Sequence, residues 1–324
     1  KNMKQFTIQP NEAGQGALKY ISKLLPGASM GLLRKSMRKK NITLNNTKME
    51  GKEKLQAGDV LTVWFSEETL AKFMETDAPR VEISSRWKVF PQWIVYEDDQ
   101  ILVLNKPAGL LSQGDGSGKE SLNDGLLSYL HDQVTATVKP SICNRLDRNT
   151  SGLVLAGKTV QALQALNGLI KDRSLKKEYQ ALVLGHMEGS GVLKGFLVKN
   201  HQTNQVRYTE KNGPGALPIE TRYHVLDTFT KKGISFSRVQ VELVTGRSHQ
   251  IRLHFSSIGH PLLGDRKYGN KESLAASDKL HIRRQMLHAF QITFPILSGP
   301  LENLSGKCFQ ADLPEDFLDV VHLS

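Results

Sequence analysis

The chain contains 324 residues, 39% of them hydrophobic, which is enough apolar material for a large folded domain and a smaller one. With 43 Lys and Arg against 32 Asp and Glu, the formal charge is +11 and we expect the surface to attract a polyanion, although an ordinary basic protein would show the same excess. The two cysteines, Cys143 and Cys308, exclude a disulfide framework and a cysteine-type zinc site, and they indicate a cytoplasmic setting. No segment is apolar enough over about 18 residues to span a membrane, so no membrane partner is expected.

The first predicted unit covers residues 8–66 and contains a strongly basic helix. Apolar residues between Ala17 and Leu25 recur at helical spacing, and Pro26 ends that pattern. Ser29 is expected to cap a second helix, whose apolar side would consist of Met30, Leu33 and Met37. Its other faces carry four cations, Arg34, Lys35, Arg38 and Lys39. Short strands are predicted at 42–44 and 60–65.

This order of elements, ending in LQAGDVLTVWF, resembles the small RNA-binding domain known from a ribosomal protein as the S-four domain. The resemblance implies that the four cations of the basic helix bind RNA phosphates. Without that resemblance, the same pattern is typical of an ordinary helix with a solvated charged face, and this alternative stays open. Residues 67–90 are polar and lack a firm period, and they predict an interdomain linker, for which partial packing against the domains is left open.

Residues 91–324 predict a larger α+β domain. Paired strands are expected around a turn at 97–100, followed by a helix marked by Leu122, Leu126 and Leu130 and by a buried strand at 153–156. Thr159 can cap another helix. Strands then dominate, at residues 178–184, 191–198, 220–226 and 234–244. The predicted architecture is a mixed, mostly antiparallel sheet.

The segment NRLDRNTSG places Asp147 on a turn between Arg145 and Arg148, just before the buried strand. The two arginines would keep this carboxylate ionised and nucleophilic if their side chains turn toward it. Alternatively, Asp147 does no more than cap the turn through backbone groups of Thr150 or Ser151.

A second polar segment, GRSHQIRLHFSSIGHPLLGDRKYG, combines basic residues, histidines and glycines with Asp265. If residues 250–255 form a strand, Gln250, Arg252 and His254 share one face, and Arg252 can reach a carboxylate from elsewhere; a helix is the alternative. The spacing of the histidines does not fit a metal site, the chain lacks the GxSxG elbow of hydrolases, and it lacks the glycine-rich loops that bind phosphate. We therefore expect no metal.

Five motifs together resemble the RluA-like pseudouridine synthases over about residues 91–300, namely NKPAGLLSQGDG, NRLDRNTSGLVLAGKT, KKEYQALVLG, the segment from Gly246 to Gly269, and RQMLHAFQITF. The resemblance implies a sheet with an active-site cleft along its middle and an enzyme that isomerises uridine to pseudouridine without a cofactor. It further implies that the partner is RNA, of the large-subunit ribosomal type, and that no obligate protein partner is needed.

The resemblance also implies roles for individual residues. Asp147 matches the nucleophile, Arg252 the arginine that pairs with it, and Tyr179 the tyrosine that lies against the uracil and assists removal of the C5 proton. Arg145 matches a residue that enters the RNA stack where the target nucleotide has flipped out. Asn144 stands where the family usually has His, so a proton role there is in doubt.

Two other functions remain open at this stage. One is a catalytically silent RNA-binding factor in ribosome assembly, which the basic helix and Asn144 favour. The other is an acid-catalysed hydrolase that uses Asp147 with Asp265. Ser248, where Thr is frequent in the family, keeps the hydroxyl and separates none of these functions.

Overall fold

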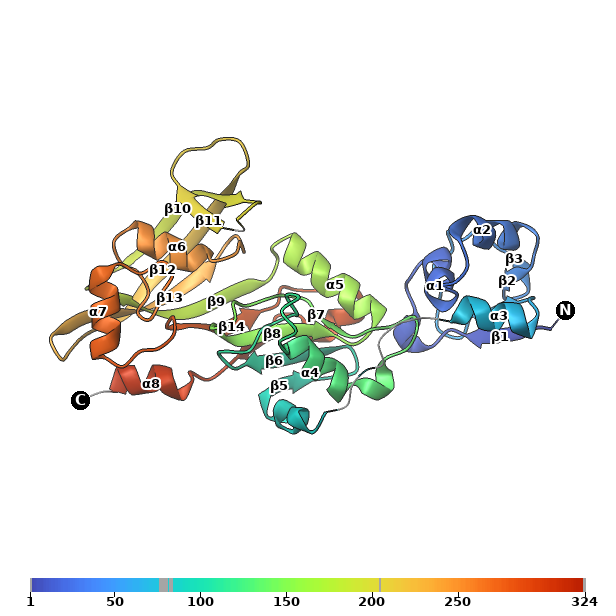
Figure 1. Cartoon of the computed structure of the whole chain (residues 1–324), viewed down its shortest axis with the longest axis horizontal. Helices are drawn as coiled ribbons and strands as arrows, with labels where there is room; N and C mark the ends of the chain where they lie inside the picture. The colour runs from blue at the N-terminus through green and yellow to red at the C-terminus, as the bar shows by residue number, and fades with distance from the viewer. Residues whose placement is uncertain (1, 76–80, 82–83, 204, 323–324) are drawn as a thin grey trace.

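The computed structural model describes residues 2–75, 81, 84–203 and 205–322. Its N-terminal unit, at one end of the molecule in Figure 1, is a small antiparallel sheet with strand order β1-β4-β2-β3, packed against helices. The strands are β1 (Lys4–Thr7), β2 (Ile42–Leu44), β3 (Thr47–Lys48) and β4 (Val60–Val63). The helices are η1 (Pro10–Glu12), α1 (Ala17–Leu24), α2 (Met30–Arg38) and α3 (Glu67–Met74).

The basic helix α2 begins where the sequence predicts. Ser29 Oγ accepts a hydrogen bond from Leu32 N at 3.3 Å, which confirms the predicted cap. Leu33 and Met37 are buried in the core of the unit, but the prediction for Met30 was wrong, because this first residue of the helix is 45% exposed. The four cations of α2 are all exposed.

Part of the predicted linker belongs to the N-terminal unit. Helix α3 is capped by Ser66, and its Leu70 packs into the core of that unit. Residues 76–80 and 82–83 of the predicted linker lie outside the described residues. Its end forms the 3₁₀ helix η2 (Ser85–Trp93), whose Trp87 packs in the core of the larger domain. The described parts of residues 67–90 are thus mostly packed against one domain or the other.

The larger domain is built on an eleven-stranded sheet with the order β11-β10-β12-β13-β9-β14-β8-β6-β5, to which β7 and β15 add at β8 and β14. Within the described residues the β14–β8 pair is parallel and the other pairs are antiparallel, which confirms the predicted mixed, mostly antiparallel sheet. Its strands are β5 (Ile94–Glu97), β6 (Ile101–Lys106), β7 (Ser141–Ile142), β8 (Ser151–Gly157), β9 (Lys176–Leu184), β10 (Ser190–Asn200), β11 (Gln205–Thr209), β12 (Ala216–Lys231), β13 (Ile234–Leu243), β14 (Leu287–Thr293) and β15 (Cys308–Gln310).

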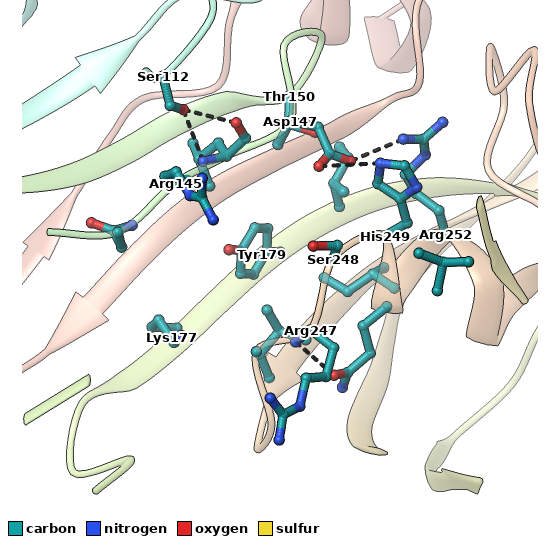
Figure 2. Close-up of a pocket in the computed structure, with 18 of the residues that line it drawn as sticks. Ser112, Arg145, Asp147, Thr150, Lys177, Tyr179, Arg247, Ser248, His249 and Arg252 are labelled. Atoms are coloured by element: carbon teal, nitrogen blue, oxygen red, sulfur yellow. Dashed lines mark hydrogen bonds and ion pairs between the residues drawn. The ribbon is translucent and has the colours of Figure 1, made fainter. Parts of the chain in front are cut away.

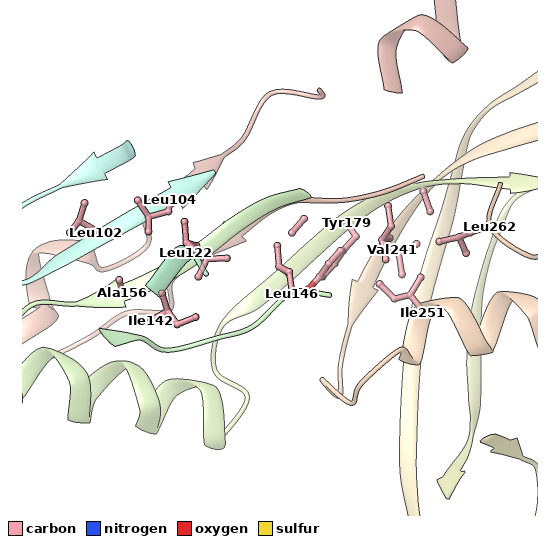
Figure 3. Packing of buried hydrophobic residues seen from close by; sticks show 14 of the residues in the cluster. Leu102, Leu104, Leu122, Ile142, Leu146, Ala156, Tyr179, Val241, Ile251 and Leu262 are labelled. Carbon is pink, nitrogen blue, oxygen red and sulfur yellow. The ribbon is translucent and has the colours of Figure 1, made fainter. Parts of the chain in front are cut away.

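Both faces of the middle of the sheet are covered, and strand β6 shows why. Its Leu102 and Leu104 join a core with α4 (Leu122–Tyr129) and α6 (Gln250–Ser257), part of which Figure 3 shows. Its Ile101 and Val103 point the other way, into a core with α5 (Val160–Lys171) and η4 (Gly299–Leu304). Successive residues therefore alternate between two hydrophobic cores, as expected for a strand buried on both faces.

The remaining helices are η3 (His131–Gln133), α7 (Lys271–Lys279) and α8 (Glu315–His322). Residues 250–257 form helix α6, the second of the two alternatives, so the shared face that a strand would give Gln250, Arg252 and His254 does not occur. With about 3.6 residues per turn, Arg252 lies on the opposite side of the helix from the other two. None of the helices in the described ranges combines the length and the apolarity that a membrane crossing needs.

A small polar contact joins the two domains. The buried Glu12 accepts a hydrogen bond from Thr137 Oγ1 at 2.6 Å, and Lys23 Nζ donates to the Thr137 carbonyl at 3.3 Å. Since η1 also contacts α5, the N-terminal unit is held beside one end of the large sheet.

Candidate active site

A pocket of about 570 Å³ lies over the middle of the sheet. Strand β9, the loop between β7 and β8, and the loop between β13 and α6 contribute its walls. Among the described residues that line it, Asp147 is the single carboxylate, whereas the cations are Arg145, Lys177, Lys199, Arg247 and Arg252. An excess of positive charge around one carboxylate suits a polyanionic substrate.

The loop that carries Asp147 is held from below by the segment after β6. Ser112 Oγ donates to the carbonyl of Leu146 at 2.8 Å and accepts from Leu146 N at 2.9 Å. The fully buried Lys106 donates to the carbonyls of Pro107, Leu110 and Arg148 at 2.9, 2.7 and 3.0 Å. Three acceptors require the three N–H donors of an ammonium group, so Lys106 is held charged although burial lowers its pKa to about 7.

The other end of this loop depends on Gly152. Its φ is +117°, and a Cβ at this position would lie 2.3 Å from the carbonyl oxygen of Ala289 on β14. A glycine is therefore needed where β8 begins beside the parallel strand β14. The turn closes with a hydrogen bond of 3.0 Å from Thr150 N to the Asp147 carbonyl, which fixes the direction in which the Asp147 side chain leaves the backbone.

Arg252 bridges two carboxylates. Its Nη1 donates to Asp147 Oδ2 at 2.9 Å, while Nε and Nη2 donate to the two oxygens of Asp265 at 2.7 and 2.9 Å (Figure 2 shows the contact with Asp147). Burial alone would raise the pKa of Asp265, which is 1% exposed, but the hydrogen bonds and charge of Arg252 outweigh it and lower that pKa. Both carboxylates are thus bound by one guanidinium whose orientation the bidentate contact with Asp265 fixes.

His249 faces the other oxygen of Asp147. Its Nε2 lies 3.7 Å from Asp147 Oδ1, and its Nδ1 is 2.5 Å from the hydroxyl of Tyr268, over whose ring the Arg252 guanidinium lies at 4.9 Å. His249 caps α6 in the left-handed conformation, with φ of +58°. Burial lowers its pKa, the charges of Arg252 and Lys267 lower it further, and that of Asp147 opposes them. His249 is therefore a neutral side chain at pH 7.

Tyr179 forms the floor of the pocket. It projects from β9 and lies between Asp147 and Lys177 in Figure 2. Burial raises the pKa of its phenol, and the negative charge of Asp147 adds to the effect. The hydroxyl consequently keeps its proton at neutral pH, and the ring offers a flat surface on which a planar base can stack.

The two arginines next to Asp147 in sequence are not its partners. Arg148 turns away, and its Nε donates to the Gly109 carbonyl at 2.9 Å, while Arg145 is exposed at the pocket wall. The interpretation that Arg145 and Arg148 keep Asp147 ionised was therefore wrong, because neighbours on a turn point in different directions. Among the described residues, the Asp147 carboxylate is contacted by Arg252 and His249, and not by the backbone of Thr150 or Ser151.

Asn144, where the resemblance would place His, has structural contacts. Its Oδ1 accepts from Leu155 N at 2.7 Å and its Nδ2 donates to the Leu153 carbonyl at 3.4 Å. An amide can make both contacts at once without a change of protonation. Asn144 thus ties the loop of Asp147 to strand β8.

The histidines of the second motif do not converge on one point. His254 bonds to Thr221 Oγ1 at 2.6 Å, His260 bonds to the Leu184 carbonyl at 2.7 Å, and His249 lies in the pocket. Over the described ranges, no group of three or more His, Cys, Asp or Glu side chains is placed to hold a metal ion.

The structure brings together Asp147, Arg252, Tyr179 and Arg145, whereas the predicted RNA-binding residues of α2 lie in the other domain. Sequence reasoning missed Lys106, Tyr268 and Lys177. A signal existed for Lys177, since it lies two residues before Tyr179 and must share its face of β9. Lys106 and Tyr268 stand inside the quoted motifs, but nothing in their spacing indicates the contacts they make.

Known proteins resemble this chain over most of its length. Residues 100–257 match the family described as RNA pseudouridylate synthase. The chain is 32% identical over 294 residues to "Ribosomal large subunit pseudouridine synthase C" of Haemophilus influenzae, which covers 90% of this chain and 87% of that protein. It is 30% identical over 327 residues to "Ribosomal large subunit pseudouridine synthase D" of Yersinia pestis, which covers 98% of this chain and 93% of that protein.

Solved structures agree on the fold. "Human RNA Pseudouridylate Synthase Domain Containing 4" superimposes with a TM-score of 0.59 at 24% identity, over 73% of this chain and 94% of that chain. "Human RNA Pseudouridylate Synthase Domain Containing 1" gives a TM-score of 0.52 at 25% identity, over 71% of this chain and 94% of that chain. The sheet and its covering helices are therefore shared with these proteins.

Proposed function

The chain belongs to the family of RNA pseudouridylate synthases and is an isomerase of RNA uridines; on this basis we propose that it acts on large-subunit ribosomal RNA with Asp147 as its nucleophile. The relatives named above support the choice of ribosomal RNA. The observation that carries the assignment of Asp147 is its position: among the described lining residues it is the single carboxylate, it is held by Arg252 at 2.9 Å, and five cations and Tyr179 line the same pocket.

The reaction needs no atoms beyond those of the uridine and the enzyme. An oxygen of Asp147 bonds to C1′ of the ribose as the bond from C1′ to N1 breaks and the uracil leaves with the electron pair. The uracil turns on the ring of Tyr179, C5 bonds to C1′, and the bond between C1′ and Asp147 breaks. C5 then loses its proton and N1 gains one, so the product is an isomer of the substrate.

Arg252 is the positioning residue for this carboxylate. Its contact to Oδ2 fixes the plane of the Asp147 carboxylate before the substrate binds, while Oδ1 faces His249 and the pocket. Asp265 holds the guanidinium in turn. An acid-catalysed hydrolase that used Asp147 with Asp265 would need one protonated carboxyl, which a shared guanidinium disfavours.

Tyr179 supports the uracil while it turns. Because its phenol stays protonated, Tyr179 assists removal of the C5 proton as a neutral hydroxyl that takes up this proton as it passes its own to N1 of the uracil, and not as a phenolate. Arg145, exposed at the pocket wall, fills the place of the flipped nucleotide in the RNA stack.

We assign RNA binding outside the pocket to the N-terminal unit. Its helix α2 and the C-cap of that helix present Arg34, Lys35, Arg38 and Lys39 to solvent, and within the described residues none of the four forms a salt bridge. Such cations bind phosphates without regard to sequence. An S-four-type domain in this position would hold structured RNA while the larger domain acts on one nucleotide.

The Asp147→Ala variant tests this function. Isomerisation of uridine in large-subunit ribosomal RNA, followed by carbodiimide labelling, should fall below detection, while RNA affinity changes less than about twofold because one carboxylate contributes little to phosphate binding. Asp132→Ala, on the exposed 3₁₀ helix η3, is the matched control and should retain full activity.

Two results would overturn the proposal. Pseudouridine formation by Asp147→Ala would remove Asp147 from the role of nucleophile. Identical labelling of ribosomal RNA from cells with and without the intact protein would favour the silent RNA-binding factor over an enzyme of ribosomal RNA.

A further inference from the structure

Two cations at the end of the pocket away from Asp147 form no ion pair with any residue that the structure describes. Lys177 projects from β9 on the same face as Tyr179, and Arg247 belongs to the loop between β13 and α6 (Figure 2). Within the described residues, neither side chain has a salt bridge or a hydrogen bond. They differ in this from Arg252 in the same pocket, which is bonded to two carboxylates.

The ammonium group of Lys177 is packed against the loop that carries Arg247. A Cβ on Gly246 would lie 3.0 Å from Lys177 Nζ, so the absence of a side chain at Gly246 leaves the room that the ammonium group occupies. The two positive charges are thereby brought to one wall of the pocket. Burial lowers the pKa of Lys177, and the charge of Arg173 lowers it further, which is the behaviour of a cation that lacks an anionic partner.

The neighbouring residue on β9, Lys176, shows by comparison how a lysine with an acidic partner is placed. Lys176 points to the opposite face of β9, is half exposed, and lies 3.4 Å from the carboxylate of Glu178. Two consecutive lysines thus differ in one respect: the one on the outer face has an acidic partner, and the one in the pocket has none. A partly buried cation without a partner gains most from an anion that the substrate supplies.

We propose that Lys177 and Arg247 form a binding subsite for a backbone phosphate next to the flipped uridine. The inference rests on the proposed function, since it takes the uridine to lie on Tyr179 with its ribose at Asp147. A phosphodiester carries one negative charge with two free oxygens, which can accept hydrogen bonds from an ammonium and a guanidinium at once. The base of an intact uridine offers two carbonyl oxygens and one N–H donor, all uncharged, so it supplies no anionic partner for the two cations when the substrate binds.

The subsite also fixes the orientation of the bound nucleotide in the pocket. The phosphate contacts hold the nucleotide by its backbone at one end, and the carboxylate meets C1′ at the other, so the ring on Tyr179 is free to turn between them. A contact to the backbone persists while the base is detached from the sugar. The subsite therefore keeps the ribose in place during the step in which the uracil is not covalently bound to it.

A pair of synthetic oligonucleotides tests the subsite without requiring isomerisation. The probes are fluorescent pentauridylate and the same oligomer with neutral methylphosphonates on both sides of the central uridine. The intact protein should bind the neutral version roughly tenfold more weakly, as expected for loss of a hydrogen bond between charged groups. Lys177→Gln should bind ordinary pentauridylate roughly threefold to tenfold more weakly and discriminate clearly less than the intact protein between the two probes, because only Arg247 then remains to contact the phosphate.

Lys176→Gln is the matched control and should behave like the intact protein with both probes. Failure of the intact protein to discriminate, or undiminished discrimination by Lys177→Gln, overturns the subsite. A third result would also overturn it: a Lys177→Gln variant with unchanged binding but a slower isomerisation at saturating RNA, which would mean that Lys177 acts on the departing uracil. Since affinities are measured directly, failure of the subsite is distinguishable from failure of Asp147 as the nucleophile.

Discussion

The two ends of the pocket carry charge in different ways. At one end Asp147, Arg252 and Asp265 are bonded to one another, and His249 and Tyr268 pack around them. At the other end Lys177 and Arg247 have no partner among the described residues. The first end is complete before RNA binds, whereas the second needs an anion to complete it. Each end should therefore fail in its own way when a charge is removed.

The difference shows how one pocket can combine precision with affinity. Reaction at C1′ needs a carboxylate fixed in direction, and a charge network that is already satisfied supplies this without help from the substrate. Binding a polyanion needs cations that are available, and these cannot be neutralised in advance by acidic residues of the same chain. Removal of a charge should thus reduce stability and rate at the first end, but only affinity at the second.

The largest effect is expected for Arg252→Met. The substitution leaves the buried Asp265 without its cation and releases Asp147, so we expect a loss of about 3–5 kcal/mol in the free energy of unfolding. The isomerisation rate should fall by at least roughly a hundredfold, because the carboxylate loses its fixed direction. Urea unfolding and the rate at saturating RNA measure the two effects.

Arg148→Met is the matched control for this prediction, since it removes an exposed guanidinium that is next to Asp147 in the sequence and is bonded to the carbonyl of Gly109. Its unfolding free energy should change by less than about 1 kcal/mol. Addition of Asp265→Asn to Arg252→Met should recover part of the lost stability. Equal losses for Arg148→Met and Arg252→Met would contradict the view that the paired end is a coupled network.

The second prediction separates this network from the helix that carries it. His254, two residues after Arg252 on α6, is 1% exposed, and burial lowers its pKa from 6.5 to about 4. Between these two pH values the unfolded chain binds a proton that the folded chain does not, so acid favours unfolding. The contribution of His254 to the free energy of unfolding is fully present above pH 6.5. It decreases by about 3 kcal/mol in all as the pH falls toward 4.

Unfolding free energies measured from pH 7.5 to pH 4 check this expectation. In His254→Gln the loss over that range should be smaller by about 3 kcal/mol, since the new side chain does not titrate. Asp265 contributes in a different range, because its lowered pKa means that its stabilisation is lost only as the pH falls below about 4. An unchanged pH dependence in His254→Gln would show that the buried imidazole accepts its proton without cost.

Local patterns in the sequence predicted the elements of the sheet, but not its charge pairs. Alternation and caps were sufficient for β6, β8 and the Thr159 cap of α5, whose Oγ1 accepts from Ala162 N at 3.0 Å. By contrast, Asp147 and Arg252 are 105 residues apart, and only the resemblance to a family brought them together. Local charge favoured Arg145 and Arg148 as partners, and the turn places both elsewhere.

The sequence predictions did not specify helices α3 and α6, but both helices have physical reasons. Helix α3 is short, but Ser66 followed by Glu67 and Glu68 is a typical beginning of a helix, so part of the predicted linker carried a helical signal. Residues 250–255 are compatible with strand or helix by period, and their length did not separate the two. Helix α6 prevails because its Ile251 and Phe255 pack four residues apart into the core under the pocket.

The smallest effect is expected in the N-terminal unit, and it tests whether the set of unpaired cations extends beyond the pocket. Replacing Arg34 and Arg38 of α2 with Gln should raise the KM for RNA roughly threefold to tenfold and flatten its salt dependence, with the rate at saturating RNA unchanged. The free energy of unfolding should change by less than about 0.5 kcal/mol, because both side chains are exposed.

The control is the double variant Lys48→Gln with Lys52→Gln, which removes the same charge from another exposed part of the unit. If both double variants raise the KM equally, net charge alone sets the affinity and α2 is not the RNA-binding face. If only the variant of α2 raises the KM, the unpaired cations of the two domains bind the same RNA molecule.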